Sequence, residues 1–117
     1  MKNYLTDSDF AYFKSRCEFW QIKLGLISWK IYYKFKFIGH NLADCSTAYS
    51  GRNATIRLHK RWTIPITKNE LDESALHEIL EVFLSPLFAQ AKSRVWDLEE
   101  YEKEHHTIIR CLERILR

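Results

Sequence analysis

The stretch WKIYYKFKF, from Trp29 to Phe37, decides the fold class of this chain. Large apolar residues occupy the odd positions, and lysine or tyrosine occupies the even positions. Neighbouring side chains of a β-strand point to opposite faces, so the alternation predicts a strand with an aromatic inner face and a basic outer face. The sequence on either side of this region has a helical period. We therefore expect a fold that combines helices with a sheet.

Two more strands are predicted directly after the first. Residues 39–41, with the sequence GHN, interrupt the alternation, and the segment from Ala43 to Tyr49 is expected to form a second strand. A turn at residues 50–53 leads to a third strand, from Ala54 to Leu58, in which apolar and polar residues again alternate. Because each strand has one polar face, we expect the three strands to form one antiparallel sheet with one side in water.

Three helices are expected around this sheet. The segment from Thr6 to Asp9 resembles a capping box and predicts the start of a first helix, which ends near Gly25. A second capping box, from Thr67 to Glu70, begins a helix that Pro86 should kink or end. A last helix is predicted from about Asp97 to Arg117. The predicted fold is α+β: a small three-stranded antiparallel sheet packed with an N-terminal, a middle and a C-terminal helix.

The composition limits the classes of protein to which this chain can belong. The 117 residues are expected to form a single domain, 1–117, and a hydrophobic content of 46% argues against disorder. A net charge of +3 is too small to indicate nucleic-acid binding by itself. No apolar run approaches the roughly eighteen residues of a membrane span, and the first residues lack the apolar region of a secretory signal. Cys17, Cys45 and Cys111 are widely spaced, which indicates reduced thiols in a cytoplasmic protein.

The middle helix contains the motif His77-Glu78-Ile79-Leu80-Glu81, which differs by one residue from the zinc-binding pattern H-E-x-x-H. Residues four apart lie on one face of a helix, so His77 and Glu81 can bind the same ion. Glu78 points to another side and can reach a metal-bound water as a base. The helix also has an apolar stripe, made up of Leu76, Ile79, Leu80, Phe83, Leu84 and Leu87. Its phase predicts that the His–Glu pair is half-buried at the edge of the core and that Glu78 faces open space.

A third metal ligand should come from another element of the fold. The last helix offers several candidates, and His105 is preferred because it falls on the apolar stripe of that helix. Glu104 and His106, on either side of it, are the alternates, and a buried histidine bonded to a backbone carbonyl is an equally good interpretation of His105. The spacing Glu102-x-x-His105 also fits di-iron helix bundles, but those sites take ligands from four helices, whereas this chain offers three and a sheet.

The order of these segments resembles a family of minimal zincin-like proteins from phage and prophage genomes. The residues that carry the resemblance are 28–29, 54–58, 75–86 and 104–116. The resemblance implies a zincin core, in which strands pack on the motif helix and the last strand borders a substrate cleft. It also implies zinc, with His77 and residue 81 as ligands and Glu78 as the base. The family pattern has histidine at 81, and a carboxylate is expected at 105. This chain has Glu81 and His105, which suggests a His-Glu-His ligand set.

Three functions follow from these observations. The first is a zinc-dependent hydrolase of peptide bonds, in which Glu78 deprotonates a zinc-bound water; Arg57 and His59 lie on the strand expected beside its cleft. The second is a zincin-like protein with impaired or lost catalysis that binds or inhibits a partner, for instance a host protein in the host cytoplasm. The third is nucleic-acid binding through the basic outer face of the sheet, which is disfavoured because such a face is more often simply solvated.

Overall fold

The computed structural model describes residues 3–48, 50–92 and 98–116. Along these residues the elements are β1 (Asn3–Tyr4), α1 (Asp7–Lys23), β2 (Lys30–Lys36), β3 (Ala43–Ala48), β4 (Asn53–His59), β5 (Arg61–Trp62), α2 (Lys68–Lys92) and α3 (Leu98–Leu116). The predicted α+β class, with three helices and a three-stranded sheet, is confirmed for this part of the chain. The short strands β1 and β5 form a separate antiparallel pair that was not predicted. Of the predicted ends, Tyr49, Asp97 and Arg117 lie outside the described residues.

The three-stranded sheet has the order β2-β4-β3. β3 and β4 are antiparallel, as expected for a hairpin, but β2 and β4 are parallel, so the prediction of a fully antiparallel sheet is wrong. The chain reverses after β2 and again after β3, which returns β4 to the direction of β2. β4 then lies between the two earlier strands. The prediction rested on the polar face of each strand, which does not specify the order of the strands, and here the last strand takes the central place.

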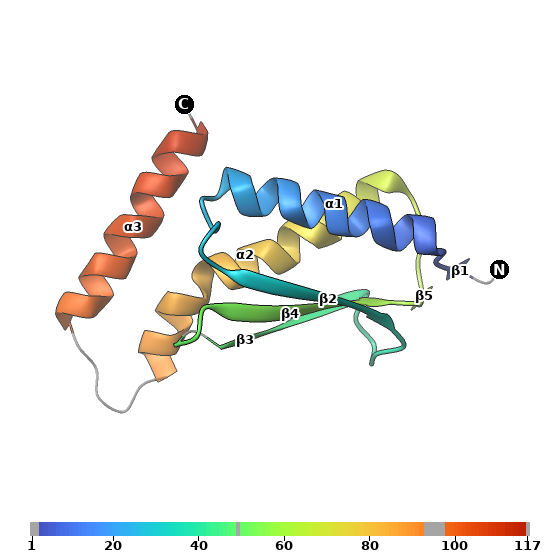
Figure 1. Cartoon of the computed structure of the whole chain (residues 1–117), viewed down its shortest axis with the longest axis horizontal. Helices are drawn as coiled ribbons and strands as arrows, with labels where there is room; N and C mark the ends of the chain where they lie inside the picture. Colours follow the sequence, from blue (N-terminus) through green and yellow to red (C-terminus); the bar gives the residue numbers. More distant parts are fainter. Residues whose placement is uncertain (1–2, 49, 93–97, 117) are drawn as a thin grey trace.

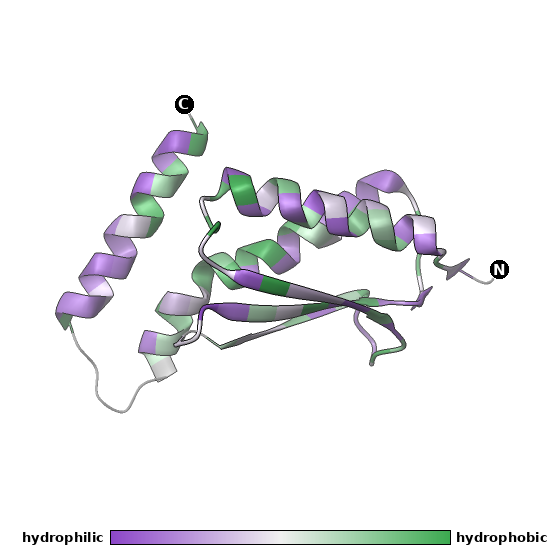
Figure 2. Cartoon of the chain, in the orientation of Figure 1, coloured by the Kyte–Doolittle hydropathy of each residue, from purple (hydrophilic) through white to green (hydrophobic). Residues whose placement is uncertain are grey.

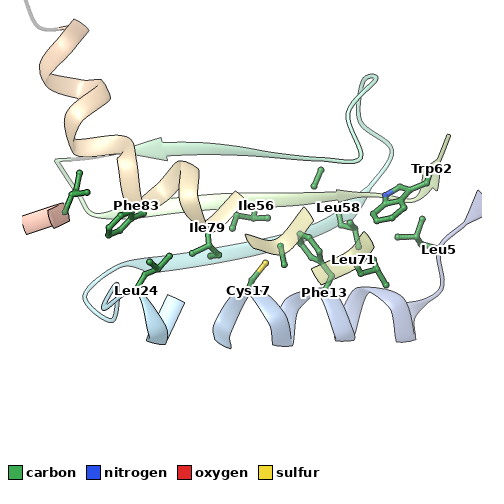
Figure 3. Packing of buried hydrophobic residues seen from close by; sticks show 13 residues of the cluster. Leu5, Phe13, Cys17, Leu24, Ile56, Leu58, Trp62, Leu71, Ile79 and Phe83 are labelled. Carbon is green, nitrogen blue, oxygen red and sulfur yellow. The ribbon is translucent and has the colours of Figure 1, made fainter. Parts of the chain in front are cut away.

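The sheet buries one face against two helices. α1 and α2 lie on the same side of it, and the two inner faces of the helices meet the central strand (Figure 1). Figure 3 shows how these side chains meet between the elements; the core residues it labels are Leu5, Phe13, Cys17, Leu24, Ile56, Leu58, Trp62, Leu71, Ile79 and Phe83. Burying each large apolar side chain of this kind contributes about 1.5–3 kcal/mol. This core holds α2 against the inner face of the sheet.

The other face of the sheet is polar and open, as the alternation predicted. Burial alternates along β2 and β4, and hydrophilic and hydrophobic residues take turns along both strands (Figure 2). Lys30 and Lys34 are exposed on the outer face, whereas Ile31 and Phe35 lie on the inner face and pack toward the helices.

Within the described residues, no helix is long and apolar enough to cross a membrane.

Both predicted capping boxes lie at helix starts. At α1 the Thr6 hydroxyl accepts a hydrogen bond from the Asp9 amide at 3.2 Å, and the Asp9 carboxylate accepts one from the Thr6 amide at 2.9 Å. At α2 the Thr67 hydroxyl accepts from the Glu70 amide at 3.1 Å. Each contact satisfies a backbone donor that has no partner within the helix, which stabilises the start of that helix.

Pro86 was predicted to kink or end the helix; it lies inside α2, so it does not end it. Proline has no amide hydrogen, so the carbonyl of Val82 loses the donor that a regular helix would provide. The buried hydroxyl of Ser85 donates to that carbonyl at 2.7 Å and replaces the missing bond. The helix therefore continues to residue 92.

The core assignment of α2 can be tested with two apolar residues of the same helix. Ile79 is fully buried between the sheet and α1, whereas Leu84 is 46% exposed. Ile79→Ala is expected to lower the free energy of unfolding by about 2–4 kcal/mol, because it leaves a cavity in the core. Leu84→Ala is expected to change it by less than about 1 kcal/mol. Urea unfolding followed by circular dichroism measures both, and similar losses for the two variants would contradict the assignment.

Candidate functional site

A cleft of about 480 Å³ separates the edge strand β3 from the middle of α2. On the sheet side it is lined by residues 41–45, and on the helix side by Glu70, Glu73, Ser74, His77, Glu78 and Glu81. The predicted motif thus faces a cleft beside the sheet. The strand that borders this cleft is β3 and not the last strand of the sheet, because β4 occupies the centre.

His77 and Glu81 are brought together, as the spacing of the motif predicts. The imidazole Nε2 and the carboxylate Oε1 are 3.7 Å apart, and both side chains point into solvent at the mouth of the cleft, with exposed fractions of 70% and 60%. The prediction that this pair is half-buried is wrong. α2 turns Ala75 and Val82 toward the core, whereas Leu84 is left at the surface. This rotation moves the His–Glu pair outward.

Glu78 is the buried carboxyl of the motif, which reverses the prediction that it faces open space. It is only 6% exposed and lines the floor of the cleft. The pKa of Glu78 is raised from its ordinary value of 4.5 to about 7, mainly by burial; His77 opposes this rise, and the nearby carboxylates of Glu81 and Asp44 contribute to it. A buried carboxyl with this pKa can take up or release a proton near neutral pH.

Cys45 of β3 also lines the cleft. Burial, with additional contributions from Glu78 and Glu81, raises the pKa of this thiol to about 12. The thiolate is the reactive form of cysteine, so Cys45 is protonated and unreactive near neutral pH. All three cysteines of the chain are free.

Arg57 and His59, which were expected along the cleft, lie on the central strand. The Arg57 Nε donates to the Asp44 carboxylate at 2.5 Å, so its charge partly neutralises one wall of the cleft from behind. The His59 Nδ1 accepts from the Arg61 amide at 3.2 Å, and its ring packs edge-on against Phe37. Neither residue lines the cleft, so neither is positioned to stabilise an oxyanion there.

The residues expected to supply a third ligand lie on α3, which packs elsewhere. α3 lies next to the end of α1 (Figure 1), where the Cys111 thiol donates to the Leu24 carbonyl at 3.3 Å. His105 is exposed and its ring stacks on that of Tyr101, while His106 is also exposed. Glu104 lines a separate hollow beside residues 24–29. None of the three candidates lines the cleft that contains His77.

The phase of α3 explains the position of His105. Its inner face runs through Glu104, Ile108 and Cys111, and Ile108 is the most deeply buried of these. Leu112, which lies two turns after His105 on the same side of the helix, is 39% exposed. The true inner face is offset by about one residue, which directs Glu104 inward in place of His105.

These positions leave an incomplete donor set for zinc. Protein zinc sites usually use three or four side-chain ligands. The cleft offers His77 and Glu81 as adjacent donors, and the described residues contain no group of three His, Cys, Asp or Glu side chains arranged to hold an ion. The described residues therefore do not fit a zinc ion held by three protein ligands.

Sequence reasoning missed most of the residues that line the cleft, including Asp44, Glu70 and Glu73. For Glu73 a signal existed, because Glu73, His77 and Glu81 follow each other at intervals of four and must share one helix face. The residues of β3 gave no comparable signal, because their place beside α2 depends on the order of the strands.

Comparisons with protein-family models, with curated proteins and with solved structures give no match for this chain.

The pKa of Glu78 predicts how stability depends on pH. The folded carboxyl has a higher pKa than the unfolded one, so between pH 4.5 and about 7 the folded state binds more protons. Stability is therefore expected to fall as pH rises through this window, by on the order of 2 kcal/mol from this group. Glu78→Gln should remove that part of the slope and unfold at higher urea than the parent at pH 8. Glu73→Gln, which changes an exposed carboxylate of the same helix, is the control and should keep the slope.

Zinc added to the purified protein is expected to bind weakly, through His77 and Glu81, because two ligands hold the ion less firmly than three. His77→Ala and Glu81→Gln should each reduce binding further, whereas His105→Ala should leave it unchanged. Isothermal titration calorimetry provides the measurement. A loss of zinc binding in His105→Ala, matching the loss in His77→Ala, would show that α3 closes onto the cleft in solution.

Proposed function

We propose that this protein is a zincin-like peptide-binding domain, in which an extended segment of a partner protein lies between β3 and α2. The observation that carries this proposal is the position of β3. Within the described part of the chain it pairs only with β4, so its other edge borders the cleft. An edge strand presents backbone donors and acceptors that an added strand can use, and this mode of peptide recognition recurs in unrelated proteins.

The hydrogen-bond pattern of the hairpin identifies the residues that would contact such a peptide. The His59 amide donates to the Leu42 carbonyl at 3.0 Å, and this pair continues the register in which Ala43 lies opposite Leu58. Bonded and non-bonded pairs alternate along an antiparallel ladder, so the next bonded residues of β3 are Asp44 and Ser46. The backbone groups of Ala43, Cys45 and Thr47 therefore point away from β4, toward the cleft.

The zincin-like character of the site is supported by the arrangement of its parts. The sheet packs on the helix that contains His77 and Glu78, and an antiparallel edge strand lies beside this motif. This matches the expectation that strands pack on the motif helix, with β3 in the place expected for the last strand. We infer that the protein acts in the reducing cytoplasm, and the free Cys17, Cys45 and Cys111 are compatible with that location.

Binding without catalysis is favoured over hydrolysis because of the donor set. Position 81 is a glutamate, the His77–Glu81 pair is exposed, and the candidates on α3 lie outside the cleft. Peptide hydrolysis remains the second candidate, since Glu78, the residue expected as the base, lies on the floor of the same cleft. The expected ligand is another protein of the same cell. If the chain is a peptide hydrolase, that partner would be its substrate.

The test uses peptides selected for binding from a random library. Each has about eight residues, a length that spans the edge of β3. Addition of a selected peptide to isotope-labelled protein is expected to shift the amide resonances of Ala43, Cys45 and Thr47 more than those of Asp44 and Ser46. Peptides that shift only residues remote from β3 and α2 would contradict the proposal.

A substitution at Thr47 gives a sharper test of the backbone contact. Thr47→Pro removes an amide at the free edge of β3 and leaves the bonds to β4, so it should weaken peptide binding about tenfold or more. Thr47→Val has a similar shape and keeps the amide, and it should bind within about threefold of the parent.

Mass spectrometry of peptides incubated with the protein distinguishes peptide binding from peptide hydrolysis. Cleavage that disappears in Glu78→Gln would favour the hydrolase.

A further inference from the structure

We propose that the segment recognised in this cleft carries a large apolar side chain, followed about four residues later by a basic side chain, when it pairs antiparallel to β3. The inference rests on the proposed peptide-binding function and adds its sequence preference. It is carried by a change of chemistry along the groove between β3 and α2, which is acidic at one end and apolar at the other.

The acidic end lies beside the start of β3 and the first turns of α2. Five carboxylates line this part of the cleft, from Asp44, Glu70, Glu73, Glu78 and Glu81. The described lining contains no lysine or arginine, and His77 is its one basic side chain. Arg57 neutralises Asp44 from behind, but Glu73 is exposed. A lysine or arginine of the bound segment would complement this charge.

The apolar end lies beside the end of β3 and the later turns of α2. A second hollow, of about 730 Å³, is lined here by Thr47, Leu80, Leu84, Ser85 and Phe88, together with three residues of the first cleft. Leu84 is 46% exposed and Phe88 is 64% exposed, although both belong to the same helix that supplies the core. A large apolar side chain placed here would bury surface that now faces water.

The two hollows form one groove, because Cys45, His77 and Glu81 line both of them. β3 and α2 also run in the same direction along it: lower residue numbers of each element lie at the acidic end and higher numbers at the apolar end. A single extended segment can therefore contact both ends, and the polarity of the groove fixes which end it meets first.

The order of the side chains follows from the direction of pairing. Antiparallel pairs are slightly more stable than parallel pairs, so the bound segment is expected to run against β3. It then enters at the apolar end and leaves at the acidic end, which places the apolar side chain before the basic one.

The spacing follows from the dimensions of α2. From Glu73 to Leu80 or Leu84 the helix rises by roughly 10 to 16 Å. An extended chain covers this distance in about three to five residues, and side chains that share a face are an even number apart. A separation of about four residues satisfies both conditions.

The test compares four capped, threonine-rich peptides of about eight residues each, a length that spans the edge strand. The first has phenylalanine four positions before lysine, the second has the two exchanged, the third has glutamine in place of the lysine, and the fourth has serine in place of the phenylalanine. We expect the first to bind about tenfold more tightly than the second and the fourth. Its advantage over the third should be about threefold to fivefold at low salt and should shrink as salt is added.

Variants of the protein assign these preferences to the two ends of the groove. Glu73→Gln should reduce the preference for lysine over glutamine, and Glu18→Gln, an exposed carboxylate of α1, is the matched control that should not. Phe88→Ser should reduce the preference for phenylalanine over serine, and Ile27→Ser, which is 79% exposed outside the groove before substitution, should not.

The outcomes separate this inference from the function on which it rests. Equal binding of the four peptides, with amide shifts on β3, would overturn the preference and leave peptide binding intact. Tighter binding of the exchanged peptide would overturn it as well. If neither these peptides nor library-selected ones bind at β3, the preference and the peptide-binding function both fail.

Discussion

The place of β4 in the middle of the sheet is the constraint on which the rest of this structure depends. Its inner side chains, Ala54, Ile56 and Leu58, are almost completely buried, and both neighbouring strands take their register from it. α1 and α2 pack on the face that these residues form. Because β4 is central, the hairpin strand β3 must lie at an edge, and this edge faces α2. The cleft is therefore a consequence of strand order and not of any residue that lines it.

The sequence was informative where the structure is governed by local periodicity. The alternation from residue 29 to residue 37 predicted which side chains of β2 are the less exposed ones, and the two capping boxes identified where α1 and α2 begin. The alternation was wrong at Phe37, which follows the end of β2 and is 60% exposed. The parallel pairing of β2 with β4 was not predictable in this way, because alternation specifies the faces of a strand but not its neighbours. The family resemblance implied that the last strand borders the cleft, but the central place of β4 gives this position to β3.

Helix phase accounts for the mistakes at the candidate site. The abundant leucines of α2 suggested that Leu80 and Leu84 face the core, but Leu80 is only partly buried and Leu84 is 46% exposed, whereas the smaller Ala75 and Val82 are fully buried. Small residues allow α2 to approach the sheet closely, which a count of large apolar residues does not register. A rotation of this kind exchanges the surroundings of adjacent residues, so Glu78 is buried while its neighbour His77 is exposed. The pairing of His77 with Glu81 was predictable because an interval of four is unaffected by rotation.

The free edge of β3 also has a consequence for the protein in isolation. An unpaired strand edge can add to the same edge of a second copy and start aggregation. Here such pairing would bring the carboxylates of two α2 helices close together, and their repulsion opposes it. The glutamates that line the groove are therefore also expected to oppose pairing of this edge between two copies of the chain. Because salt screens this repulsion, the solubility of the protein is expected to depend on the same charges that we propose to select the bound segment.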